Sequence, residues 1–153
     1  MACAVQLTQC LQHRMGDTNP GTMLAVDTSV ILSILKGEDQ GALWLARLQD
    51  EASTRDLVAS AVVWSEVRAF FGNHRDCQMA FDALKIGFGA IDKSAALLAG
   101  DIFRQYRKAG GSRSAVLPDF LVAAHAAIHA TALATTDRGY FRQYFPKLNI
   151  LSL

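Results

Sequence analysis

The feature that most constrains the fold is a repeated alternation of short apolar runs with segments of helical periodicity, which begins at Met23. The first run, Leu24–Val26, stops at an acid, and apolar residues then recur at helical spacing as far as Gly37. Such alternation is typical of a sheet whose strands are mostly parallel and joined by crossover helices. The sequence therefore predicts an α/β domain with a mostly parallel central sheet flanked by helices.

The same periodicities set the expected bounds of the later elements. Ser60 is a preferred helix cap, and Gly110–Gly111 is a helix stop. Besides the first strand and helix, we expect strands near 57–59, 88–91, 133–135 and 149–151, the last at an edge, and helices near 39–51, 60–70, 77–84, 93–108 and 118–130. No internal repeat interrupts this order.

Length and charge limit the possible functions. The chain has 153 residues, of which 51% are hydrophobic, which is enough for one compact domain. Its net charge is only +1, from 15 basic and 14 acidic residues, so it lacks the overall positive charge of a constitutive nucleic-acid binder. Any polyanion must therefore be held by a local patch.

Cysteine usage and hydropathy bear on the cell compartment. Cys3, Cys10 and Cys77 are odd in number and match no zinc-finger or CxxC spacing, so we expect them to be reduced. No run of eighteen apolar residues is present, and the amino terminus does not resemble a signal peptide. We expect a soluble, cytoplasmic protein that does not contact membranes.

The first 22 residues stand apart from the alternating pattern. They become polar towards Asn19-Pro20-Gly21, a turn signal directly before the apolar run at Met23. The expected organisation is an N-terminal extension, residues 1–22, followed by a single domain, residues 23–153. The extension could be a true arm, a mobile segment or a start-site artefact, and we assign it no role.

Four acids occupy equivalent places in this scheme, either directly after a strand or in the first turns of the next helix: Asp27, Glu66, Asp119 and Asp137. The carboxyl ends of parallel strands meet at one edge of a sheet, so these residues can converge. Converging carboxylates raise one another's pKa values unless a cation neutralises them. Oxygen-only sites of this kind suit Mg²⁺ or Mn²⁺, which in nucleases hold the scissile phosphate and activate water.

Three of the acids also have purely structural interpretations. Asp27 could simply cap the helix that follows it. Asp119, after Pro118, could stabilise a helix start through the helix dipole. Asp137 could belong to an ordinary turn with Arg138.

Glu66 differs from the other three acids. It lies beside Val63, Val67 and Phe70 on a helix face that we expect to pack inward. A buried carboxylate is costly unless it is paired with a cation or a proton. Its structural alternative is an ion pair, for example with Arg68.

The surrounding motifs resemble those of a known family. The segments MLAVDTS at 23–29, VWSEV at 63–67, LPDFLVAA at 117–124 and LATTDR at 133–138 resemble, in order and spacing, the motifs of PIN-domain VapC toxins from VapBC toxin–antitoxin systems. The resemblance covers nearly everything from Met23 onward. Two features depart from the usual pattern: the segment before Met23, and Asp101, an extra acid that we leave outside the site.

The resemblance implies a Mg²⁺- or Mn²⁺-dependent endoribonuclease that acts as a toxin on RNA. By position, Asp27, Glu66, Asp119 and Asp137 match the acidic quartet of the family, as catalytic residues and metal ligands, and Thr28, Ser29 and Thr136 adjoin it. It further implies a homodimer and a cognate VapB-like antitoxin partner. The RNA target stays open.

Several other residues are candidates for a supporting role. An acidic pocket repels RNA, so basic residues must attract it, and the candidates are Arg104, Arg107, Lys108, Arg113, Arg138 and Arg142, each of which could equally be a solvated surface residue. His125 and His129 share a helix face, but without the glutamate of an HExxH motif we expect packing or interface histidines rather than zinc ligands. Trp44, Trp64 and Phe70-Phe71 are expected in the core or a dimer interface rather than as base-stacking platforms.

Other function classes fit less well. A haloacid-dehalogenase pattern wants an acid two positions after Asp27, where Ser29 stands, and a receiver-type phosphoacceptor wants a late lysine after a strand, whereas Lys147 follows Pro146. The remaining alternative is a non-catalytic PIN-like module that binds RNA or a protein. Only the complete quartet of acids argues against it.

Overall fold

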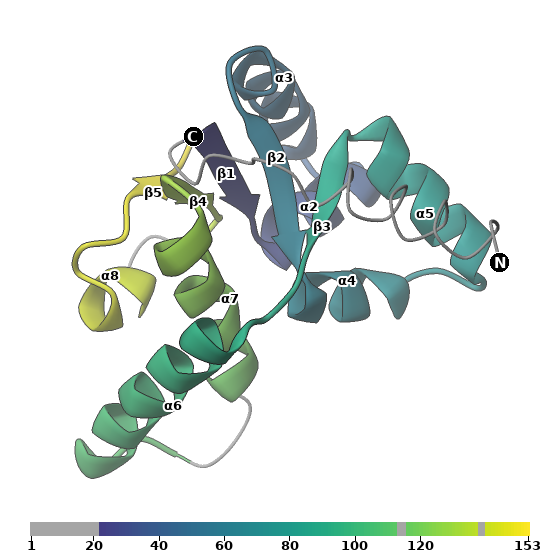
Figure 1. Cartoon of the computed structure of the whole chain (residues 1–153). Helices are drawn as coiled ribbons and strands as arrows, with labels where there is room; N and C mark the ends of the chain where they lie inside the picture. The colour runs from purple at the N-terminus through teal and green to yellow at the C-terminus, as the bar shows by residue number, and fades with distance from the viewer. Residues whose placement is uncertain (1–21, 113–115, 138–139) are drawn as a thin grey trace, which may run out of the picture.

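A central sheet of five parallel strands organises the molecule (Figure 1). The computed structural model describes residues 22–112, 116–137 and 140–153. In spatial order the strands are β3 (Ile86–Gly89), β2 (Asp56–Ser60), β1 (Met23–Val26), β4 (Ala132–Ala134) and β5 (Ile150–Leu151). The predicted α/β class with a parallel sheet is therefore confirmed.

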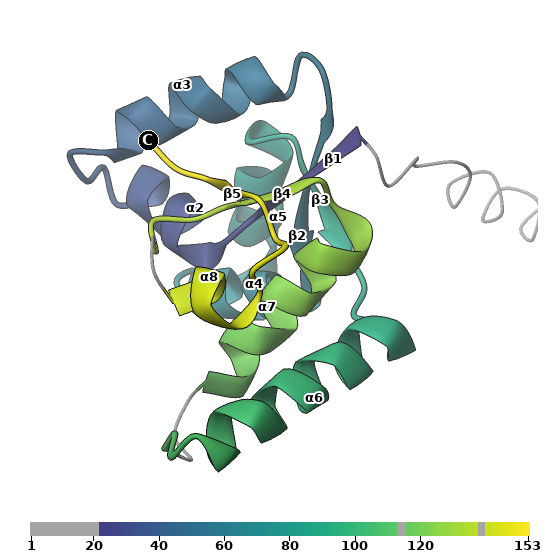
Figure 2. The same ribbon diagram turned by 90° about the vertical axis from the view of Figure 1, so that its left-hand side faces the viewer.

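Helices connect the strands and cover the sheet. Along the described chain they are α2 (Thr28–Leu35), α3 (Gly41–Glu51), α4 (Ala61–Arg68), α5 (His74–Ala83), α6 (Lys93–Lys108), α7 (Val116–His129) and α8 (Tyr140–Tyr144). The long helices α6 and α7 lie side by side and extend beyond the sheet (Figures 1 and 2). The part of the chain described contains no helix long and apolar enough to span a bilayer.

The strands have continuous apolar sequences because they lie in the core. In β1, residues 24–26 are almost completely buried, as expected for a central parallel strand covered on both faces. Trp44 from α3, Phe120 from α7 and Leu133 from β4 are also fully buried. Trp44 is thus a core residue, as expected, whereas Trp64 is half-buried and stacks on Phe81 with ring centroids 3.6 Å apart.

Several predicted bounds need correction. Strand β3 covers residues 86–89 rather than 88–91, because Lys85 adopts φ 56°, which ends the preceding turn and lets Ile86 pair with Leu57. Strand β4 lies one residue earlier than predicted, and the short helix α8 was not predicted. Helix α7 begins at Val116, two residues before Pro118, because proline in a first helical turn gives up no intrahelical hydrogen bond.

The expected inward face around Phe70 is wrong. Helix α4 ends at Arg68, so Phe70 lies in the following turn and is 47% exposed, while its ring makes an edge contact with Phe71. Of the three cysteines, Cys77 is free, as expected; it is also buried, and burial raises the pKa of its thiol. Cys3 and Cys10 lie outside the described residues, as does nearly all of the 1–22 extension.

Candidate active site

Asp27 lies between the central strand β1 and the helix α2, at the carboxyl edge of the sheet. It directly follows β1 and caps α2, where its Oδ1 accepts a hydrogen bond from the Thr28 backbone N–H at 2.8 Å. Its own N–H donates to the carbonyl of Ala134 in the neighbouring strand β4 at 2.9 Å. The structural interpretation of Asp27 as a helix cap is therefore correct, but capping occupies only one carboxylate oxygen.

Two hydroxyl groups hold the second oxygen of Asp27. Ser29 Oγ donates to Oδ2 at 2.7 Å, and Thr135 Oγ1 donates to the same atom at 2.9 Å. These hydroxyls in turn accept backbone N–H groups, Ser29 from Thr136 at 3.2 Å and Thr135 from Asp137 at 3.1 Å. The charged form of Asp27 is thus well solvated by the protein, and its position is linked to that of Asp137.

Thr135 is the member of this network that the sequence interpretation missed. Its side chain is completely buried, although it lies beside the half-buried Asp27. The family resemblance points only to the adjacent Thr136. Strand β4 ends at Ala134, so the Thr135 hydroxyl lies at the edge of the sheet. The sequence feature that could have identified Thr135 is a hydroxyl residue two positions before the acid Asp137.

Glu66 lies in α4 and faces solvent, which corrects the prediction that it is on an inward face. The buried stripe of α4 is formed by Val63 and Val67, and Glu66 is rotated about 100° from Val67 around the helix. Its Oε2 accepts a hydrogen bond from the Thr28 hydroxyl. Arg68 donates instead to the carbonyl of Phe71 at 2.6 Å.

Asp119 provides the electrostatic evidence that the four acids are gathered. It lies in the first turn of α7, and its pKa is raised to about 6. The largest cause is partial removal of water from around the carboxyl group, followed by the negative charges of Asp27, Glu66 and Asp137. The three other acids predicted from the sequence are therefore close enough to act on Asp119, and they come from the carboxyl ends of β1, β2 and β4 and the helices after them.

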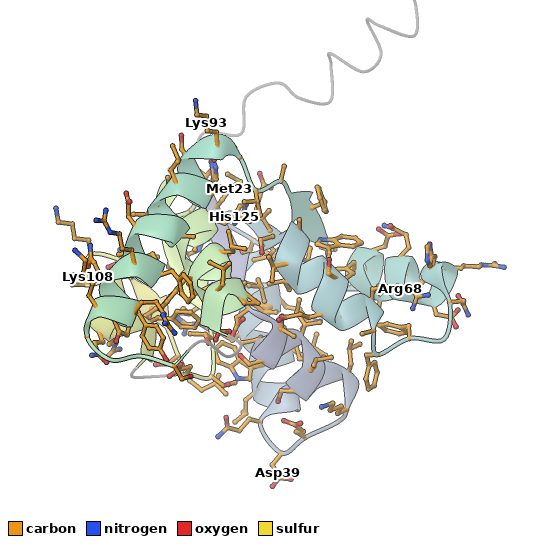
Figure 3. The ribbon with its side chains drawn as sticks, turned by 90° about the horizontal axis from the view of Figure 1, so that it is seen from below. Met23, Asp39, Arg68, Lys93, Lys108 and His125 are labelled. Atoms are coloured by element: carbon orange, nitrogen blue, oxygen red, sulfur yellow. The ribbon has the colours of Figure 1, made fainter. Side chains whose placement is uncertain are left out.

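The basic residues are unevenly distributed around the site. Of the basic residues proposed to attract RNA, Arg104 and Lys108 are exposed on α6, and Arg107 donates to the carbonyl of Gly111 at 3.3 Å. Seen from below, Lys108 lies far from Arg68 of α4, on the opposite side of the molecule (Figure 3). The remaining candidates are Arg142, exposed on α8, and Arg113 and Arg138, which fall outside the described residues.

The two histidines of α7 occupy a different part of the molecule. His125 is buried, as expected for a packing residue, and its Nδ1 has no hydrogen-bond partner. Its pKa is lowered to about 4, first by burial and then by the charge of His129. His129 Nε2 lies 2.9 Å from Asp92 Oδ2, and Asp92 is also the N-cap of α6, a contact that the sequence did not reveal.

Asp27, Glu66, Asp119 and Asp137, which we call the acid edge, offer oxygen donors that suit a hard divalent cation. A cation would relieve the repulsion that, after burial, contributes to the raised pKa of Asp119. In the arrangement of side chains described here, no three His, Cys, Asp or Glu residues are grouped closely enough to hold one metal ion. Direct ligation by three acids would therefore need movement of side chains, and water molecules can complete an incomplete shell.

Comparison with known proteins identifies the fold. The PIN-domain family profile matches residues 24–145. The fold is similar to that of VapBC2 from Rickettsia felis, solved in complex with a promoter DNA fragment; the identity is 16%, the TM-score is 0.65, and the match covers 85% of this chain and 98% of that one. It is also similar to that of VapBC-1 from nontypeable Haemophilus influenzae, with 18% identity, a TM-score of 0.64, and coverage of 85% of this chain and 97% of that one.

A further solved structure, FitAcB from Neisseria gonorrhoeae, is 25% identical, with a TM-score of 0.56 and coverage of 84% of this chain and 96% of that one. No curated protein sequence matched the chain. The family profile spans the elements from β1 to α8, including the four acids and the hydroxyl network around Asp27. The chain therefore belongs to the PIN-domain family.

Proposed function

We propose that this protein is the toxin of a type II toxin–antitoxin pair and acts as a Mg²⁺- or Mn²⁺-dependent endoribonuclease. The observation that carries the proposal is the gathering of four acids from separate segments at the carboxyl edge of the sheet. There, burial and then the charges of the other three acids raise the pKa of Asp119 to about 6. PIN-domain proteins of the VapC type are generally nucleases, and the solved relatives are toxin–antitoxin complexes.

The proposed mechanism gives each part of the edge a task. Asp27, Glu66, Asp119 and Asp137 would hold the ion, which supplies a water of lowered pKa and neutralises charge on the scissile phosphate. Ser29 and Thr135 orient the Asp27 carboxylate by donating hydrogen bonds to it. Thr28 orients Glu66 in the same way. The basic side chains of α6 attract the RNA backbone towards a site whose own charge repels it.

Partners follow from the same proposal. The expected substrate is RNA, the expected inhibitor is a VapB-like antitoxin, and the expected assembly is a homodimer in the cytoplasm. Support for the antitoxin comes from the solved structures with this fold, which include VapBC complexes. The order of the four motifs in this chain supports the same assignment.

The direct test is cleavage of total cellular RNA by antitoxin-free protein in Mg²⁺, Mn²⁺ or EDTA. Wild type is expected to give discrete, metal-dependent cuts, and Asp119→Asn should cut at least about 100-fold more slowly. Asp101→Asn is the matched control, because Asp101 is an exposed acid of α6 that we place outside the site. Equal cutting by wild type and Asp119→Asn would reject the site.

The alternative is a PIN-like module that binds RNA or protein without cutting. One observation favours it: in the described part of the chain no three acids are grouped closely enough for direct metal ligation. RNA binding by both wild type and Asp119→Asn, without cleavage by either in any metal, would establish this alternative.

A further inference from the structure

An apolar groove of about 360 Å³ lies between α6, the end of α7 and the chain from α8 to β5. Both α6 and α8 lie beside α7 (Figures 1 and 2). Most of the described residues that line the groove are aliphatic or aromatic, among them Leu98, Ile102, Ala127, Tyr144 and Phe145. Only Lys147 among them is charged. Walls of this composition suit apolar side chains, which gain free energy when they leave water.

The groove adjoins the place where the described chain begins. Thr131, one of its lining residues, donates both its backbone N–H and its hydroxyl to the carbonyl of Met23, each at 2.9 Å. Arg55 donates in turn to the Thr131 hydroxyl at 3.0 Å. Strand β1 therefore starts beside one end of the groove, and residues 1–21 are connected to the fold at that place.

The sequence of this N-terminal extension has an apolar stripe at helical spacing. At 100° per residue, the stripe covers about 120° of a helix and consists of Cys3, Ala4, Leu7, Cys10 and Leu11. The glutamines at positions 6, 9 and 12 fall outside it. A short amphipathic helix is marginal in water by itself, so such a segment needs an apolar surface to cover its stripe.

The linker between the stripe and the fold is long enough for docking. Residues 12–22 can span up to about 35 Å when extended, and Thr131 connects the groove directly to Met23. Asn19-Pro20-Gly21 is a turn signal, which allows the chain to reverse before β1. A tether of this length holds the segment at a millimolar local concentration, which favours it over the same segment of a second copy.

A second cavity, of about 650 Å³, also adjoins Met23, but it suits the stripe less well. Its lining includes Asp56, Lys85, Asp92 and His129. An apolar stripe docked there would remove water from charged groups without replacing their hydrogen bonds, which costs free energy. The groove beside α8 is therefore the better match.

We infer that residues 3–11 form an amphipathic helix that docks in this groove of its own chain, with Leu7 and Leu11 against the apolar wall. The groove is thus an intramolecular docking surface for the N-terminal extension. The inference does not depend on nuclease activity, so either proposal can fail without the other.

The test traps the contact through Cys10, a native residue of the stripe, in the full-length chain carrying Cys3→Ser. Ala127→Cys adds a thiol at an exposed position of the groove, and Ala96→Cys is the matched control on the exposed side of α6. Under mild oxidation, Cys10 should form a disulfide with position 127 at least about tenfold faster than with position 96, because docking raises the local concentration above that of a free tether. Peptide mass spectrometry identifies the disulfides.

Two substitutions in the extension make the result specific to the stripe. Leu7→Asp adds a charge to the stripe, so trapping at position 127 should slow to the rate measured at position 96. Gln9→Asp adds the same charge on the opposite side and should leave trapping unchanged. A second measurement needs no added cysteine: the Ile102 methyl signal in NMR, identified with Ile102→Val, should shift with Leu7→Asp and not with Gln9→Asp.

Three outcomes would overturn the inference. Equal trapping at positions 127 and 96 would show a tether without docking. Faster trapping with Phe88→Cys than with Ala127→Cys would place the segment in the second cavity, which Phe88 lines. Disulfides that join two chains rather than one would mean that the groove takes the extension of a second copy. An Ile102 signal that Leu7→Asp does not move would contradict the contact directly.

Discussion

The acid edge and the histidine pair of α7 both contain ionisable groups in buried or crowded surroundings, but their hydrogen bonding differs. At the edge, the Asp27 carboxylate accepts hydrogen bonds from Thr28, Ser29 and Thr135, which stabilise its charge. In α7, the His125 Nδ1 has no partner, and the pKa of the ring is lowered to about 4. The fold thus stabilises the charge of Asp27 and disfavours the charge of His125.

Position in the fold explains the difference. The acids follow the carboxyl ends of strands, where backbone N–H groups and hydroxyls of loop residues are free to donate. His125 instead lies in the C-terminal half of α7, where its ring packs against Gly89 of β3, and in the view from below it is well separated from Asp39 (Figure 3). That packing favours the neutral imidazole. The pKa of Asp119 at the acid edge is raised and that of His125 is lowered, so stability should change with pH in opposite senses through these two groups.

The largest expected effect is on stability in acid. The His125 pKa of about 4 lies below its ordinary value of 6.5, so the unfolded chain takes up the proton first as the pH falls. The stability that this difference provides is present above pH 6.5 and is lost as the pH falls through 4, by about 3 kcal/mol in total. Chemical denaturation of wild type and His125→Leu between pH 7.5 and 4 measures the difference in slope.

A control at the surface completes this comparison. His74 is an exposed histidine of α5, so His74→Gln should keep the acid sensitivity of wild type. If His125→Leu loses stability in acid as steeply as wild type does, another group must be responsible and the contrast between the two regions fails.

The second effect concerns the contact between His125 and β3. A methyl group added at Gly89 would meet Val58 Cγ2 at 3.0 Å and the His125 ring at a shorter distance. Because the ring is held in the core, Gly89→Ala should lower the free energy of unfolding by about 1 to 3 kcal/mol. Gly100→Ala, in an exposed part of α6 with nothing within 4 Å, should instead raise it by about 0.5 to 1 kcal/mol.

Combining Gly89→Ala with His125→Ala makes the assignment specific. The smaller side chain at 125 creates space for the added methyl group, so the double variant should be more stable than the sum of the single effects predicts. Additive losses in the three denaturation curves would mean that Gly89 is needed for another reason, such as the backbone conformation of β3.

Much of the fold was readable from the sequence because long, strongly periodic segments determine it. Helix α6 has the predicted bounds, since Asp92 precedes it and Gly110 follows it with a positive φ. The errors fall at short elements, where tertiary contacts decide. Strand β3 depends on pairing with β2, which no local pattern records, and the five-residue helix α8 is too short to show a period.

The site was partly readable for a related reason. Acids placed after strands can be recognised in the sequence, because parallel topology brings strand ends together whatever lies between them. The surroundings of those acids could not be predicted: Glu66 is exposed, Thr135 rather than Thr136 donates to Asp27, and the Trp44 Nε1 lacks an acceptor. These properties depend on side-chain directions, which sequence spacing does not determine.

The smallest expected effect tests the acid edge by stability alone. The pKa of Asp119 is raised from 3.8 to about 6, so its carboxyl group favours the folded state only when protonated. That contribution is complete below pH 3.8 and is lost as the pH rises through 6. In EDTA at pH 7.5, Asp119→Asn should therefore unfold at a higher denaturant concentration than wild type, by about 1 kcal/mol or less, because Asp119 is exposed and solvent screens its charge.

The greater stability of Asp119→Asn over wild type should vanish at pH 4, where the wild-type carboxyl group is also neutral in the folded protein. Mg²⁺ should reduce it at pH 7.5 if the edge holds a cation, since the ion stabilises only the charged wild-type site. An Asp119→Asn variant that is less stable than wild type at pH 7.5 would contradict the raised pKa. It would mean that Asp119 acts mainly at the helix start, where its negative charge stabilises the first turn of α7.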